Sequence, residues 1–76
     1  MKSMKREMKL WLMKMTDARI ENWVRVGDVI YGEIYEDSKG RFVDGEGIVT
    51  SRIVSADNDT VQTVNTLYKL GTPYRG

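Results

Sequence analysis

Hydrophobic residues follow two different periods along the chain, and the first region runs to Thr16. Its apolar positions recur at steps of three and four, which is the spacing of one face of an α-helix. These positions are Met1, Met4, Met8, Trp11 (or Leu12) and Met15. No glycine or proline interrupts the stretch, so the pattern predicts an amphipathic helix from Lys2 to Met15. In an alternative interpretation, residues 9–14 form the first β-strand instead.

The second region, from Ile20 to Tyr74, follows a period of two, which is typical of β-strands. Residues 23–26 and 29–35 together count as the first of five predicted strands. The other four are residues 41–43, 48–55, 60–66 and 67–70. Between them lie turns rich in aspartate, serine, asparagine and glycine, at residues 36–40, 44–47 and 56–59. In the last of these turns, Asn58 is the residue expected to adopt a positive φ angle.

Short strands at this spacing predict an antiparallel meander. A flat sheet of this size would leave two open edges, so we expect it to curl into a small barrel. The predicted fold is therefore mainly β, a five-stranded antiparallel SH3-like (or OB-like) barrel over residues 17–76. The basic N-terminal arm of residues 1–16, with its amphipathic helix, would cap the barrel or pair with another copy. Gly32 and Gly47 lie where such a barrel would bend sharply.

The residue types restrict the possible chemistry. The 76 residues include no cysteine and no histidine, which excludes disulfides and thiolate metal sites and removes the commonest general base. The remaining catalytic candidates, Ser38 with Lys39 and Asp44 with Glu46, lie in predicted turns, where exposed polar side chains are the simpler interpretation. The sequence therefore predicts a protein that is not an enzyme and that has no metal site and no cofactor.

The apolar segments are short. None approaches the roughly 20 apolar residues of a transmembrane helix. The basic N-terminus also lacks the long apolar stretch and cleavage site of a signal peptide. We therefore expect a cytoplasmic protein that does not bind membranes.

The net charge changes sign at the position where the period of the hydrophobic residues changes. Residues 1–16 carry five basic side chains against one acid, a net charge of +4, whereas residues 17–76 carry seven against ten, a net charge of −3. A basic arm with a methionine-rich stripe suits contact with another macromolecule. We expect a protein partner, and the predicted contact residues are Met8, Trp11, Leu12, Met15, Tyr31 and Tyr35.

Two other functions fit the same sequence. Small barrels often bind nucleic acid through aromatic side chains set among basic ones. The residues available for that role are Lys5, Arg6, Lys9, Lys39 and Arg41. Against it, Glu33 lies between Tyr31 and Tyr35 on one strand face, where it would repel phosphate. The other alternative is a self-assembling homo-oligomer in which the N-terminal helix pairs between copies.

A longer pattern is present after Ile20. It consists of Arg41-Phe42, Asp44-Gly45 and Thr50-Ser51, followed by Thr63-Val64-Asn65-Thr66-Leu67-Tyr68-Lys69-Leu70-Gly71. Over about residues 20–71 the chain resembles small proteins of bacteriophage, prophage and plasmid origin. These proteins have no general biochemical role in common. Because a small chain of such origin without catalytic residues is most often a binder, we expect a modulator of a host protein or complex in the host cytoplasm, such as an anti-defence or transcription-modulating inhibitor. No functional residue can be assigned to this chain from the resemblance.

The same pattern carries structural expectations. We expect Phe42 and Leu70 to lie in the core. The polar members of the pattern are expected to satisfy backbone groups or to form a polar contact surface. They are Thr50, Ser51, Asn65 and Thr66.

Overall fold

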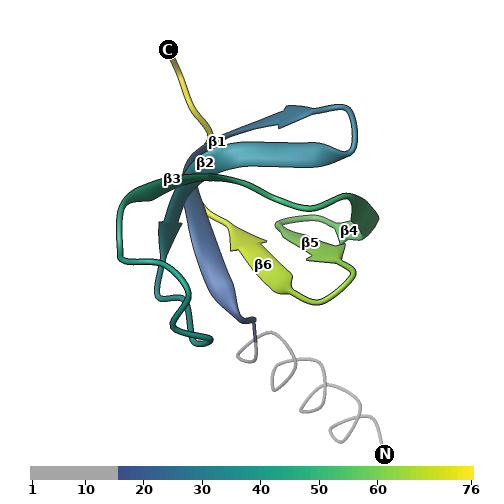
Figure 1. Ribbon diagram of the computed structural model, residues 1–76. Helices are drawn as coiled ribbons and strands as arrows, with labels where there is room; N and C mark the ends of the chain where they lie inside the picture. Colours follow the sequence, from purple (N-terminus) through teal and green to yellow (C-terminus); the bar gives the residue numbers. More distant parts are fainter. Residues whose placement is uncertain (1–15) are drawn as a thin grey trace, which may run out of the picture.

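The computed structural model describes residues 16–76, which contain six β-strands and no helix (Figure 1). The strands are β1 (Ala18–Val26), β2 (Val29–Tyr35), β3 (Glu46–Val49), β4 (Ile53–Asp57), β5 (Thr60–Thr63) and β6 (Leu67–Leu70). The prediction of a mainly β protein is confirmed for this part of the chain. The predicted N-terminal helix, and the alternative strand at residues 9–14, lie outside the described residues.

The six strands form one sheet in the order β3-β2-β1-β6-β5-β4. Strands β1, β2 and β3 make one antiparallel meander, and β4, β5 and β6 make a second. The two meanders meet where β1 and β6 pair in parallel, as Figure 1 shows near the centre of the sheet. Each meander therefore supplies one edge strand, β3 on one side and β4 on the other.

The prediction of a closed five-stranded barrel is wrong, because the sheet is open between β3 and β4. Only residues 50–52 separate these two edge strands in the sequence. Both ends of this connection bond back toward β2: the Thr50 amide donates to the Ile30 carbonyl (2.8 Å) and the Ile53 amide to the Asp28 carbonyl (2.6 Å). Because the connection is held against β2, the sheet curls strongly without its edge strands pairing.

Three predicted strand segments also need correction. Residues 41–43 lie in the loop between β2 and β3, because the Asp37 carboxylate accepts the backbone amides of Arg41 and Phe42, and the Glu46 carboxylate accepts that of Val43 (3.3 Å). The predicted strand 60–66 ends at Thr63, whose amide donates to the Thr66 carbonyl (2.9 Å) and closes a tight turn. The segment 48–55 is divided between β3 and β4. In contrast, residues 29–35 and 67–70 form strands with the predicted bounds.

The core lies on the inner, concave face of the sheet. Its buried hydrophobic members are Ala18, Ile20, Ile30, Ile34, Val61, Tyr68 and Leu70. The prediction for Leu70 is confirmed, since it is buried in this cluster, whereas Phe42 is only half-buried and packs against the cluster. Gly32 lies under Ile20, because a Cβ at Gly32 would come within 2.4 Å of the Ile20 Cγ2 atom. A side chain at Gly32 would therefore displace the centre of the core.

A β-bulge in β1 changes which side chains face the core. Before the bulge, Glu21 pairs with Glu33, and after it Val24 pairs with Tyr31, so one extra residue is inserted in β1. Asn22 in the bulge has a φ angle of 50°, in the left-handed region that asparagine tolerates. Since side chains alternate between faces, the extra residue moves Val24 from the inner to the outer face.

The chain after β6 covers the second half of β1 on the side away from β2. The Gly71 amide donates to the Ile20 carbonyl (2.8 Å) and the Tyr74 amide to the Trp23 carbonyl (2.9 Å). The Trp23 indole N–H in turn donates to the Gly71 carbonyl (2.9 Å). These bonds anchor the C-terminal residues along β1 although they lie beyond the last strand.

Candidate interaction surface

The outer face of the first meander carries a row of exposed hydrophobic side chains. Val24 of β1 lies opposite Tyr31 of β2, and Tyr31 lies opposite Val49 of β3. Directly paired residues point to the same face, so the three side chains form a row across three strands. Their exposed fractions are 40%, 51% and 53%, and Val26, two residues after Val24, is 55% exposed. We call Val24, Val26, Tyr31 and Val49 the outer ridge.

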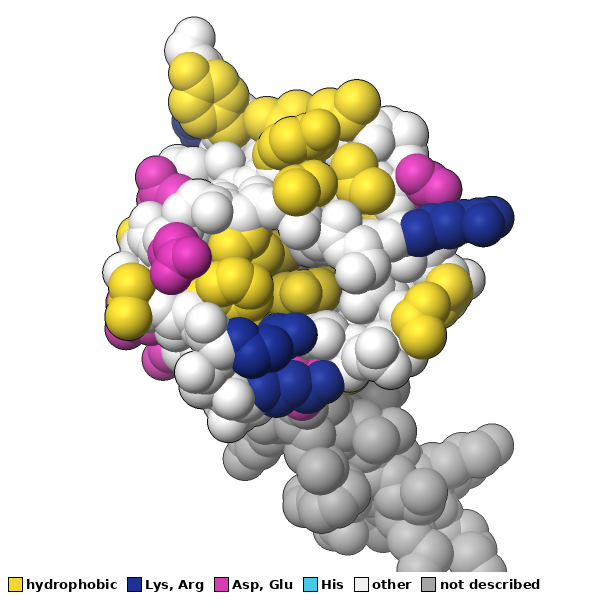
Figure 2. All heavy atoms as spheres, in the orientation of Figure 1, with side chains coloured by type: hydrophobic (Ala, Val, Ile, Leu, Met, Phe, Trp, Pro, Cys, Tyr) yellow, Lys and Arg dark blue, Asp and Glu magenta, His cyan; other side chains and the backbone are white. Residues whose placement is uncertain are grey.

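Figure 2 shows hydrophobic side chains gathered at the top of the molecule, where Figure 1 places the hairpin of β1 and β2. The outer ridge belongs to this end of the sheet, beyond the bulge. An ion pair joins Asp28, in the turn of the same hairpin, to Arg52 in the connection between β3 and β4 (3.2 Å). The ridge thus combines an apolar surface with charged side chains at its border, which is the composition of a protein-binding patch.

The other half of the outer face is polar. Glu21 lies directly opposite Glu33, a pairing of like charges that would be unfavourable alone. Glu21 is stabilised by the Arg19 guanidinium (2.7 Å) and by the Thr72 amide (2.7 Å). Glu33 accepts hydrogen bonds from the Asn22 side chain (3.1 Å) and the Tyr35 hydroxyl (3.3 Å). The two carboxylates therefore each have their own donors.

These contacts shift two pKa values. The hydrogen bond from the Thr72 amide, with the nearby Arg19, lowers the pKa of Glu21 despite partial desolvation. Desolvation and the neighbouring Glu33 raise the pKa of Tyr35. The Arg19 guanidinium also lies over the Tyr35 ring, 5.2 Å from its centroid. Tyr35 is therefore part of a polar network, whereas Tyr31 belongs to the outer ridge.

The loop of residues 36–45 is organised by Asp37, whose side chain is only 1% exposed. Its carboxylate accepts the backbone amides of Lys39 (3.2 Å), Arg41 (2.7 Å) and Phe42 (3.1 Å), and it pairs with the Arg41 guanidinium (3.4 Å). Desolvation alone would raise the pKa of Asp37, but these hydrogen bonds outweigh it and lower the pKa. These hydrogen bonds keep the backbone amides of Arg41 and Phe42 out of the strand ladder.

Two basic residues predicted for nucleic-acid binding meet at Thr66. The Arg41 guanidinium donates to the Thr66 hydroxyl (3.2 Å), and the Lys39 ammonium donates to the Asn65 carbonyl and lies 3.4 Å from the same hydroxyl. Both cations also lie near carboxylates, Arg41 beside Asp37 and Lys39 within 4.0 Å of Asp17. These contacts give both side chains a role in holding the loop against the turn between β5 and β6.

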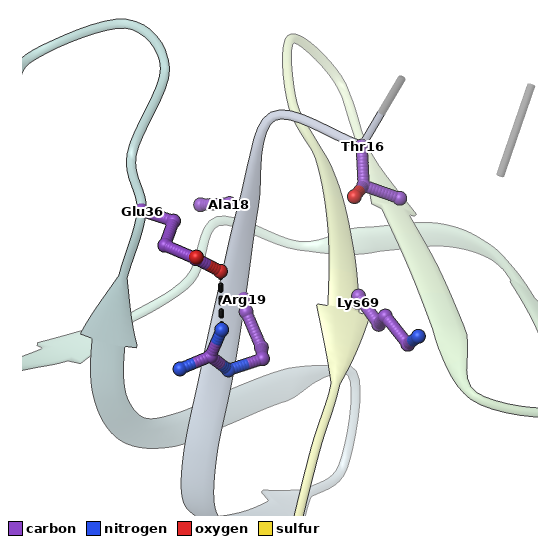
Figure 3. Close-up of a pocket in the computed structure, with 5 residues that line it drawn as sticks. All are labelled: Thr16, Ala18, Arg19, Glu36 and Lys69. Atoms are coloured by element: carbon purple, nitrogen blue, oxygen red, sulfur yellow. Dashed lines mark hydrogen bonds and ion pairs between the residues drawn. The ribbon is translucent and has the colours of Figure 1, made fainter. Parts of the chain in front are cut away.

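A pocket of about 280 Å³ lies at the beginning of β1 (Figure 3). Its lining residues are Thr16, Ala18, Arg19, Glu36 and Lys69. The Arg19 guanidinium forms an ion pair with Glu36 across it, as the dashed line in Figure 3 marks. Because Arg19 also binds Glu21, its charge is already compensated, and the pocket presents a polar surface of mixed charge.

Within residues 16–76, no group of three histidine, cysteine, aspartate or glutamate side chains is arranged to hold a metal ion. In the same range, no helix is long and apolar enough to cross a membrane.

Two of the four polar residues of the sequence pattern, Thr50 and Thr66, behave as expected. Thr50 accepts a hydrogen bond from the Ile30 amide (3.0 Å), and Thr66 is buried against Lys39 and Arg41.

The structure thus places the predicted contact residues in different settings. Tyr31 is exposed in the outer ridge and Tyr35 lies in the polar network. The remaining predicted protein-contact and nucleic-acid-contact residues lie outside the described part of the chain: Lys5, Arg6, Met8, Lys9, Trp11, Leu12 and Met15. Sequence reasoning missed Val24, Val26 and Val49, because only the bulge and the strand register bring them beside Tyr31.

Comparison with known proteins gives no relative: no family model matches the chain, and no curated protein or solved structure matches it significantly. The resemblance to phage, prophage and plasmid proteins therefore stays a prediction from the sequence. The fold and the outer ridge are the observations on which a function can be argued.

Proposed function

We propose that this chain is a non-enzymatic, phage-type protein-binding module that modulates a host protein or complex by direct contact. The observation that carries the proposal is the alignment of Val24, Tyr31 and Val49 across three strands on the outer face. A contiguous apolar row on a rigid sheet is a common feature of surfaces that bind other proteins.

The ridge suits a protein partner because of its shape and composition. Tyrosine is enriched in binding hot spots, since it offers a large apolar area together with a hydroxyl group. Tyr31 lies at the centre of the row with a valine on each side. The strands hold these side chains in place before any partner arrives, which reduces the entropy lost on binding.

The modulator role rests on the sequence resemblance to small phage, prophage and plasmid proteins. The nucleic-acid alternative is less well supported, because Lys39 and Arg41 already contact Asp17, Asp37 and Thr66. A phosphate group would have to compete with these acceptors for the same cations.

The proposal is tested by capture from nuclease-treated host-cell lysate with three tagged versions of the full chain. The first is the natural chain, and the second carries Tyr31→Thr and Val49→Thr in the ridge. The matched control carries Val43→Thr and Val64→Thr, which change side chains that are 73% and 71% exposed outside the ridge. Threonine keeps a preference for β-structure while removing the apolar surface.

We expect one host protein to be captured by the natural chain and by the control, and to be lost with the ridge variant. Equal capture by the ridge variant and the control would contradict the proposal. Recovery of nucleic acid alone, decreasing steeply as salt is raised, would favour the nucleic-acid alternative.

A further inference from the structure

The two edges of the sheet differ in how well they are protected against pairing with another chain. Exposed edge strands are usually protected from such pairing by bulges, charged side chains or proline. β4 has a register shift between Ile53 and Ser55 and is bent there. β3 has a regular register with β2 over all four residues, Glu46–Val49, contains no proline, and carries a single charged side chain, Glu46 at its start. β3 is therefore the edge better suited to pair with a strand of another chain.

The hydrogen bonds of β2 and β3 show which peptide groups face this edge. The Thr50 amide donates to the Ile30 carbonyl, so Thr50 and Ile30 form a hydrogen-bonded pair that continues the ladder. Such pairs alternate in an antiparallel ladder, and Ile48 opposite Gly32 is the next one. Gly47 and Val49 consequently direct their N–H and C=O groups toward the open edge.

The outer face beside this edge specifies the side chains of an added strand. Val49 ends the outer ridge at the edge, so an apolar residue beside it would extend the ridge by one strand. Two residues away on the same face, a Cβ at Gly47 would meet nothing within 4 Å, and Gly47 lies opposite Glu33. A basic side chain crossing this empty space would reach the Glu33 carboxylate.

The chain itself contains a segment with this spacing. In residues 9–14 (Lys-Leu-Trp-Leu-Met-Lys), Leu12 and Lys14 are two residues apart and would share one face of a strand. Residues 1–16 carry a net charge of +4, opposite in sign to the −3 of residues 17–76. In an antiparallel arrangement, Leu12 would lie beside Val49 and Lys14 beside Gly47.

The same copy cannot supply this segment. The added strand would lie three strand spacings from β1, or about 14 Å. Lys14 beside Gly47 would then lie in the same row across the sheet as Glu33 and Glu21. Thr16 is five residues from Glu21 along β1, about 16 Å further. The two residues from Lys14 to Thr16 span at most about 7 Å. The segment therefore has to come from a second copy.

We infer that residues 9–14 of a second copy add to the β3 edge as an antiparallel strand, with Leu12 extending the outer ridge and Lys14 reaching Glu33. Strand addition leaves the outer face uncovered, so Leu12 of one copy and Tyr31 of the other lie on one continuous surface. Each copy alone has an incomplete ridge. The inference goes beyond the proposed function, because it rests on the β3 edge and on the spacing and charge of residues 9–14.

The test uses disulfide formation, because the natural chain has no cysteine. Full-length Leu12→Cys is mixed with full-length Val49→Cys under mild oxidation, and in parallel with Val64→Cys, a control at an exposed site in the turn between β5 and β6. Paired strand residues have Cα separations that a disulfide can bridge. We expect the 12–49 heterodimer to form at least about tenfold faster than the 12–64 heterodimer, because binding raises the local thiol concentration. Equal rates would overturn the inference.

A second measurement requires no cysteine. Sedimentation of the natural chain over a range of concentrations should show self-association, weakened about tenfold by Val49→Pro, which corresponds to the loss of one or two hydrogen bonds. Proline at position 49 removes only an N–H that faces the open edge, so pairing with β2 is retained. A natural chain that stays monomeric throughout would overturn the inference. Since both tests contain only this protein, they are independent of capture from lysate.

Discussion

Val24 lies directly opposite Tyr31 on the outer face, although its sequence parity would place it on the inner face with the fully buried Ile20. The bulge between Glu21 and Val24 causes this change, because one inserted residue reverses the faces of all the residues that follow in β1. The outer ridge is therefore a product of the bulge.

The bulge depends on a residue that tolerates positive φ, and Asn22 is at 50°. We expect Asn22→Val to lower the free energy of unfolding by about 1–2 kcal/mol relative to Asn22→Gly, because a β-branched residue is strained in this region. Both variants lose the hydrogen bond from Asn22 to Glu33, so the comparison isolates the backbone. Urea denaturation followed by circular dichroism measures the difference, and equal stability of the two variants would contradict this account of the bulge.

Gly32 and Gly47 lie on strands next to each other but differ in their surroundings. We expect Gly32→Ala to destabilise the fold by about 1–3 kcal/mol, because its Cβ would overlap Ile20 in the core. Gly47→Ala serves as the control, with a change of zero or a gain of about 0.5–1 kcal/mol, since a Cβ there meets nothing and a strand glycine is entropically costly. Thermal denaturation of both variants tests the prediction, which fails if Gly32→Ala is as stable as the natural chain.

Thr50 is 5% exposed, and its hydroxyl accepts the Ile30 amide. Thr50→Val keeps the shape but leaves that buried amide without its hydroxyl partner, so we expect a loss of about 1–3 kcal/mol. Thr50→Ser retains the hydroxyl, and its loss should be smaller. Amide hydrogen exchange at Ile30 provides a local readout, which should accelerate in the valine variant; unchanged exchange would show that the hydroxyl contributes little.

Asp37 should make stability depend on acid pH. The pKa of Asp37 in the folded chain is below the reference value of 3.8. As the pH falls through this value, the unfolded chain binds a proton at Asp37 before the folded chain does, so folding releases that proton. The contribution of Asp37 is therefore fully present above about pH 3.8 and is lost as the pH falls through the lower folded pKa. Glu21, whose pKa is also lowered, acts in the same direction.

The variant Asp37→Asn tests this dependence. At neutral pH it should cost about 1–3 kcal/mol, because hydrogen bonds to a buried carboxylate are replaced by weaker ones. Its stability should also fall less steeply with acid than that of the natural chain. Asp57→Asn removes the same charge from an exposed position and should retain the natural acid profile. Parallel profiles for Asp37→Asn and the natural chain would contradict the role given to Asp37.

The sequence predicts the local elements well where one physical signal dominates. Residues 29–35 and 67–70 form strands as predicted, since each is a run of β-forming residues bounded by turns. Asn58 has the expected positive φ of 38° in the hairpin of β4 and β5. Residues 41–43 have strand propensity too, but the buried Asp37 carboxylate binds the amides of Arg41 and Phe42, and these contacts depend on the folded loop.

The candidate site could be predicted only in part. Tyr31 and Tyr35 share a strand face, as their parity indicates. Their neighbours in the folded sheet separate them, because Val24 lies opposite Tyr31 whereas Arg19 lies opposite Tyr35. Strand pairing and the bulge are long-range features, so the periodicity of one strand cannot reveal which residues of another strand complete the ridge.

The central claim, that the outer ridge is a protein-binding surface, is tested most directly by site-specific photocrosslinking in host cells. A photoreactive benzoylphenylalanine replaces Tyr31 in one version of the full chain and Val43, which is exposed outside the ridge, in another. We predict that position 31 crosslinks one predominant host protein and that position 43 does so weakly or not at all. Failure of position 31 to crosslink a protein, or equal crosslinking from both positions, would contradict the claim.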